Sequence, residues 1–76
     1  MLGRYRHYKG KDYEVIGVGL HTETREKMVV YRALYDTPEL TEEYGPQPLF
    51  IRPYEEFVGD VEVGGKPVPR FEYQAD

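Results

Sequence analysis

Two histidines and one glutamate are the residues of this chain that come closest to a metal-binding or catalytic set. His7, His21 and Glu23 could offer two imidazole nitrogens and a carboxylate to Zn²⁺ or a similar ion. The histidines are far apart in the sequence, and the short repeats that mark zinc motifs are absent. The alternative is that each histidine forms a hydrogen bond at a strand end or a turn. We predict no metal ion and no cofactor.

Covalent catalysis has few candidate residues, because the sequence contains neither cysteine nor serine. His21 and Glu23 resemble a base and its orienting carboxylate, but residues two apart on an extended segment share a face without forming a dyad. A chain of 76 residues also offers little enclosed volume from which water could be excluded. A small enzyme that uses His7, His21 and Glu23 is therefore the least favoured class.

A third group of residues is aromatic and basic. Tyrosine and arginine anchor protein interfaces, because they combine rigid contact area with hydrogen-bonding ends. The same residue types could stack on nucleobases and contact phosphates, or the tyrosine rings could form the walls of a small core. The group comprises Arg4, Tyr5, Arg6, His7, Tyr8, Lys9, Lys11 and Tyr13, joined by Tyr31 and Arg52.

The charge of the chain bears on which partner this group would bind. The net charge is -4, and residues 36–76 contain ten acids against three basic residues. Affinity for nucleic acid depends largely on neutralising phosphates, which such an acidic half opposes. A protein or peptide is therefore the predicted partner, and nucleic acid is the alternative.

Composition also limits compartment and organisation. Without cysteine the chain forms no disulfide, which suits a reducing compartment. No apolar run approaches the ~18 residues of a membrane span, and no apolar stretch follows the charged N-terminus as in a signal peptide. We expect a cytoplasmic protein with no membrane contact and a single domain over 1–76. Its oligomeric state is not predicted.

Alternating apolar and polar residues, with turn residues between them, predict the elements that hold these side chains. Thr37–Gly45 has an N-cap candidate followed by proline and reads as an acidic surface excursion, helical or not. Pro53–Phe57 reads as one helical turn. The result is an all-β fold with one or two short helical turns, a small SH3-like barrel of five or six strands. The expected strands are 3–9, 13–21, 28–35, 48–53, 61–63 and 66–73.

Local chemistry adds three expectations. Gly17 and Gly19 leave one strand face bare, which permits a bend or the close approach of another backbone. The segment 21–24 is either a turn in which threonine hydroxyls form hydrogen bonds with backbone amides or a recognition loop. Arg52 is held extended by the following proline and pairs with an acid such as Glu23 or one in the 55–56 turn, or with a ligand. The predicted binding residues are Arg4, Arg6, His7, Tyr8, His21, Glu23, Tyr31 and Arg52.

Several blocks, in this order, resemble a small bacterial family of domains of unknown function. They are Gly3-x-Tyr5-x-His7-Tyr8-Lys9-Gly10-x-x-Tyr13-x-Val15, His21-x-Glu23-Thr24, Val29-Val30-Tyr31-x-Ala33-Leu34-Tyr35, Arg52-Pro53, Phe57 and Pro69-Arg70-Phe71. The resemblance implies a stand-alone compact domain and brings no activity or catalytic residue. This chain departs from the family at Phe50, where a tryptophan is expected, and in a longer 36–48 excursion.

Overall fold

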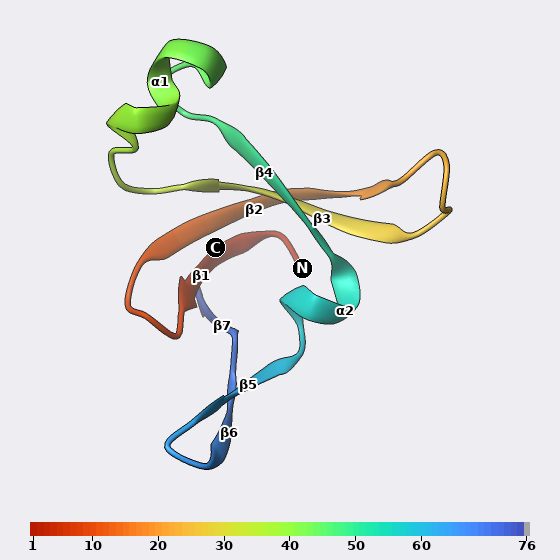
Figure 1. Ribbon diagram of the computed structural model, residues 1–76, viewed down its shortest axis with the longest axis vertical. Coiled ribbons are helices and arrows are strands. Elements are labelled where there is room, and N and C mark those ends of the chain that lie inside the picture. The colour runs from red at the N-terminus through yellow and green to blue at the C-terminus, as the bar shows by residue number, and fades with distance from the viewer. Residues whose placement is uncertain (76) are drawn as a thin grey trace.

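An open, five-stranded antiparallel sheet contains most of the regular structure. The computed structural model describes residues 1–75 (Figure 1). Its strands pair in the order β4-β3-β2-β1-β7, so β4 and β7 are the edges. The strands are β1 (Gly3–His7), β2 (Asp12–Leu20), β3 (Lys27–Ala33), β4 (Leu49–Pro53) and β7 (Phe71–Ala75).

Four shorter elements lie between these strands. Helix α1 (Pro38–Tyr44) connects β3 to β4, and the single turn α2 (Tyr54–Phe57) follows β4 directly. Strands β5 (Asp60–Val63) and β6 (Lys66–Pro69) form a separate hairpin, which extends away from the main sheet in Figure 1. Neither helix of the part that the structure describes is long and apolar enough to cross a membrane.

The all-β prediction with one or two short helical turns is confirmed, and residues 1–75 contain seven strands rather than five or six. The expected strand over 66–73 divides at Arg70, because β6 pairs with β5 whereas β7 pairs with β1. The SH3-like barrel is not confirmed, since edge strands β4 and β7 are not hydrogen bonded to each other. Phe57 of α2 packs on Phe71 of β7 with ring centroids 4.1 Å apart, so ring stacking joins the two edges.

One face of the sheet forms the core. Cross-strand partners lie on the same face, and the register places Val15 opposite Tyr31 and Tyr31 opposite Phe50. Val15, Val29, Tyr31, Phe57 and Phe71 are buried there. The rings meet mostly edge to face, which is a favoured geometry for aromatic pairs. Tyr31 is 5% exposed, so this tyrosine is a wall of the core.

The bend predicted at the glycines of β2 coincides with a β-bulge. The β2–β3 register shifts between Val15 and Gly17, and a bulge of this kind increases the local twist of a sheet. A Cβ atom at Gly17 would meet nothing within 4 Å, and one at Gly19 would meet only the Val30 side chain at 3.8 Å. These glycines permit bending and do not accommodate a second backbone.

Gly59 is the glycine whose replacement should destabilise the fold. A Cβ atom there would lie 2.8 Å from the carbonyl oxygen of Glu55, a backbone atom that cannot move aside alone. We expect Gly59→Ala to lower the free energy of unfolding by about 1–3 kcal/mol. Gly17→Ala is the matched control and should change it by less than about 0.5 kcal/mol. Urea denaturation of both variants checks this, and equal midpoints would show that the α2–β5 turn relaxes freely.

Candidate functional site

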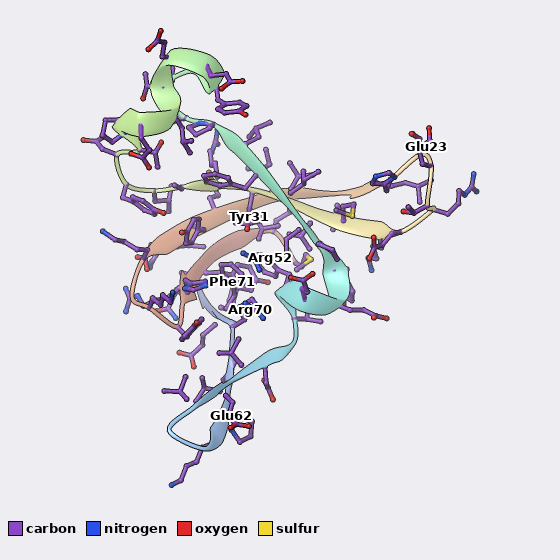
Figure 2. All side chains as sticks on the ribbon, in the orientation of Figure 1. Glu23, Tyr31, Arg52, Glu62, Arg70 and Phe71 are labelled. Carbon is purple, nitrogen blue, oxygen red and sulfur yellow. The ribbon has the colours of Figure 1, made fainter. Side chains whose placement is uncertain are left out.

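Arg52 of β4 lies at the centre of the core face. Its Nε donates a hydrogen bond to the Tyr31 hydroxyl (3.2 Å), and its guanidinium lies 5.7 Å from the centroid of the Phe71 ring. Its Nη1 lies 3.4 Å from Glu56 Oε1. Figure 2 shows Tyr31, Arg52 and Phe71 close together in the middle of the molecule, with Glu23 at a distant hairpin tip. Of the predicted partners of Arg52, the acid of the 55–56 turn is therefore right and Glu23 is wrong.

A cleft lies between α1 and β4, with Arg52 in its lining. It consists of two adjoining hollows of about 460 Å³ and 270 Å³, which share Tyr31, Leu40, Phe50 and Arg52. We call the two hollows together the α1 cleft. The larger hollow is completed by Tyr44, Pro48, Leu49 and Ile51, and the smaller by Tyr13, Tyr35, Thr37 and Glu39.

The smaller hollow carries a pair of phenol groups. The hydroxyls of Tyr13 and Tyr35 are 2.7 Å apart, close enough for one to donate to the other. Burial, followed by the hydrogen bond with Tyr35, raises the pKa of Tyr13 well above its ordinary value. Tyr13 therefore stays protonated near neutral pH, and two phenols that share one hydrogen bond keep a second O–H for another acceptor.

Thr37 begins α1 and also lines the smaller hollow. Pro38 occupies the first helical turn and Gly45 ends the helix with a φ of 86°, as the sequence predicts. The Thr37 side chain does not cap the helix, and its Oγ1 is buried without a hydrogen-bond partner in the described chain. Thr37 contacts the first turn of the helix through its backbone carbonyl oxygen, which accepts a hydrogen bond from the Thr41 hydroxyl (3.2 Å).

Strand β4 has a free edge along this cleft. Among residues 1–75, β3 is the only strand with which β4 pairs. Leu49 and Ile51 point to the outer face and are 58% and 62% exposed, while Phe50 and Arg52 point to the core face. The larger hollow is lined by all four, so it follows the edge of the strand. An unpaired edge of this kind is a template for another strand.

His7 places an imidazole ring on the core face. Its ring contacts Phe71 with centroids 4.9 Å apart, and its Nδ1 accepts from the Lys9 backbone N–H (3.2 Å). Burial lowers the pKa of His7 below its ordinary value, and the charges of Arg52, Lys9 and Arg70 lower it further. The positive charges of Arg52, Lys9 and Arg70 therefore disfavour the protonated form of the His7 ring.

The lowered pKa of His7 predicts a dependence of stability on pH. The unfolded chain takes up a proton on this residue near pH 6.5, before the folded protein does, so acid favours unfolding. We expect the free energy of unfolding to fall as the pH drops from about 7 to 5. The lowered pKa of Asp12 makes the free energy of unfolding depend on pH only below about pH 4. Urea midpoints should lose this slope in His7→Gln, and an identical slope in both proteins would contradict the assignment.

Two of the eight predicted binding residues, Tyr31 and Arg52, line the α1 cleft, and Arg4, Arg6 and Tyr8 are among those that lie away from it. Arg4 and Arg6 alternate with Tyr5 along β1, so they point to the opposite face of the sheet. Both form ion pairs with Asp12, at 3.1 and 2.8 Å. Tyr8 is exposed in the β1–β2 turn. The structure therefore separates Arg4 and Arg6 from Tyr31 and Arg52, while Arg6, His7 and Tyr8 line one hollow of their own at the end of β1.

His21 and Glu23 lie in the β2–β3 hairpin loop, at the opposite end of β2 from His7. The His21 Nδ1 accepts the backbone N–H groups of Glu23 and Thr24, at 3.2 and 3.3 Å, which is turn chemistry. The structure does not bring His7, His21 and Glu23 together. Within residues 1–75, no three histidine, cysteine or acidic side chains form a group that could hold a metal ion.

The sequence interpretation missed the part of the cleft that α1 contributes. Leu40, Tyr44 and Thr37 belong to the segment interpreted as a surface excursion. The cap-proline-glycine pattern indicated the helix, but no local pattern specifies that a helix folds back over a strand edge. Phe50, the aromatic residue that departs from the expected tryptophan, lines both hollows.

Comparisons with known proteins identify relatives but no activity. The model of a family described as protein of unknown function (DUF1653) matches residues 3–73. The crystal structure of a DUF1653 protein from Bordetella bronchiseptica is 36% identical, with a TM-score of 0.82. The match covers 99% of this chain and 87% of that one. No curated protein is significantly similar to the chain.

Proposed function

We propose that this chain, which belongs to the DUF1653 family of unknown function, is a binding module for an extended segment of a partner protein. Because the family brings no activity, the proposal rests on the geometry of the site. The segment would add to the free edge of β4 and lie in the α1 cleft. The main-chain groups of the two strands would supply affinity, and alternate side chains would supply selectivity. A protein or peptide is also the partner that the sequence predicts, but the binding face proposed here follows β4 and not β1.

One observation carries the proposal: the unpaired edge of β4 runs along a cleft walled by α1. A bound strand would place its side chains alternately against Leu49 and Ile51 on one face and Phe50 and Arg52 on the other. Leu40 and Tyr44 of α1 would close the cleft over it. The larger hollow, at about 460 Å³, is of the size that peptide side chains and small ligands occupy.

The charge distribution supports a protein partner over nucleic acid. Arg4, Arg6 and Arg32 of the outer face are each paired with an acid of β2. The smaller hollow is also lined by Glu39, an exposed acid of α1. Such a surface would repel phosphates along most of its length.

Selection from a displayed library of random twelve-residue peptides tests the proposal. We expect enriched peptides rich in β-branched residues, whose addition shifts the amide resonances of 49–52 and of α1 in the ¹⁵N-labelled protein. A parallel titration with single-stranded RNA and DNA provides the counter-screen. Salt-sensitive binding of nucleic acid without any enriched peptide would contradict the proposal, as would shifts confined to the β2–β3 hairpin.

A further inference from the structure

The Arg52 guanidinium has donors to spare. Of its five N–H groups, one is hydrogen bonded to the Tyr31 hydroxyl and one reaches Glu56 at 3.4 Å. The Glu56 side chain is 55% exposed, whereas that of Arg52 is 28% exposed. Ion pairs with such an exposed partner contribute little. A ligand carboxylate could therefore replace Glu56 at low cost.

Nearby groups favour the same kind of ligand. Arg70 contacts the same residue as Arg52, because its Nε donates to the Glu56 backbone carbonyl (3.2 Å), and Arg70 forms no ion pair within residues 1–75. The Tyr13–Tyr35 pair, in the hollow that Arg52 also lines, keeps one O–H for an acceptor. A second arginine and a hydroxyl donor thus lie near Arg52, and a negatively charged acceptor fits them.

We infer that the segment bound along β4 carries a carboxylate, which Arg52 binds in the α1 cleft. This inference rests on the proposed function. The bound group is a single carboxylate, because Glu39, which lines the smaller hollow together with Arg52, would repel a run of acids. A carboxylate matches the planar guanidinium fork and can accept two parallel N–H bonds from it.

The carboxylate has two possible sources. Arg52 lies near the C-terminal end of β4. An aspartate or glutamate side chain of the bound segment could reach it from either strand direction. A C-terminal carboxylate would reach it only from a segment that runs parallel to β4 and ends there.

Four synthetic peptides distinguish these sources. The probe is the acetylated octapeptide Lys-Thr-Val-Thr-Xaa-Thr-Val-Thr, with glutamate or glutamine at Xaa and a free or amidated C-terminus. We expect the carboxylate-bearing forms to bind at least about tenfold tighter than the glutamine amide. Tighter binding of the two glutamate peptides would show that Arg52 binds a side-chain carboxylate. Tighter binding of the two peptides with a free C-terminus would show that it binds the main-chain carboxylate. Equal binding of all four along β4 would overturn the inference and leave the proposed function standing, whereas absence of binding would overturn both.

Variants of Arg52 test whether this side chain causes the preference for carboxylate-bearing peptides. Arg52→Gln should abolish this preference, and Arg52→Lys should retain only part of it, because lysine lacks the planar fork of N–H groups. Arg25→Gln, in the exposed β2–β3 loop, removes the same net charge and should retain the preference. Because Arg52→Gln could unfold the core, NMR titration of the His7 ring in the wild-type protein gives a second readout. A carboxylate peptide should raise the pKa of His7 and the glutamine amide should not; an equal pKa with both would overturn the inference.

Discussion

Phe57→Ala is expected to lower the free energy of unfolding by about 3–5 kcal/mol, the usual cost of removing a buried phenylalanine ring. The Phe57 side chain is 1% exposed and stacks on Phe71, with ring planes 7° apart. It also meets the edges of Tyr5 and Tyr31, each with centroids 5.3 Å away. A loss of this size is a large part of the roughly 5–15 kcal/mol that stabilises ordinary domains. A substantial fraction of the variant should therefore be unfolded at physiological temperature.

Val58→Ala is the matched control, because Val58 is the next residue and is 51% exposed. It should change stability by less than about 0.5 kcal/mol. Urea denaturation followed by circular dichroism and tyrosine fluorescence measures both variants. A loss below about 1 kcal/mol in Phe57→Ala would mean that α2 does not hold the two sheet edges together.

The double variant Leu49→Thr/Ile51→Thr is expected to bind the selected peptides about 30-fold more weakly than the wild-type protein. Each side chain is more than half exposed and would be covered by the added strand. Losing roughly 1 kcal/mol of apolar burial at each position gives this factor. Threonine has a high strand propensity, and leucine and isoleucine are replaced at exposed positions of β4, so the stability of the fold should change little.

Val18→Thr/Leu20→Thr is the control for this variant. These β2 side chains are 46% and 55% exposed, and they do not line the α1 cleft. Isothermal titration should give the control the affinity of the wild-type protein. An equal loss in both double variants would mean that exposed aliphatic residues bind peptides without regard to position.

The strands were predictable because their signals are local. The Met28–Tyr35 run of β-branched and aromatic residues indicated a central strand, and β3 is paired on both sides. The turn at α2 was predicted from its proline and acids, whereas the proline and the cap candidate at the start of α1 left that segment open as helical or not. Each of these features depends on fewer than about ten consecutive residues, which is the range that propensity and periodicity describe.

The open sheet was not predictable in the same way. Pairing of β7 with β1 joins the two ends of the chain, and it depends on Phe71 and Tyr73 meeting His7 and Tyr5. Nothing local distinguishes that pairing from continuation of the β5–β6 hairpin. Whether β4 then pairs with β7 depends on the curvature of the whole sheet and on the packing of Phe57.

The candidate site was half predicted. Tyr31 and Arg52 were selected from the sequence, and the register places them on one face, in hydrogen-bond contact. Arg4 and Arg6 were grouped with them because arginine and tyrosine are residue types that anchor interfaces. The two-residue period places Arg4 and Arg6 on one face of β1, but it does not specify which face of β1 is shared with Tyr31 and Arg52.

Hydrogen exchange of the β4 amides tests the central claim most directly. The ¹⁵N-labelled protein would be measured with and without a saturating peptide from the display selection. Peptide addition along β4 predicts that alternate amides within residues 49–52, those that point to the free edge, exchange at least about tenfold more slowly in the complex. Unchanged exchange along β4, with protection along β7 or in the β2–β3 hairpin instead, would contradict the account.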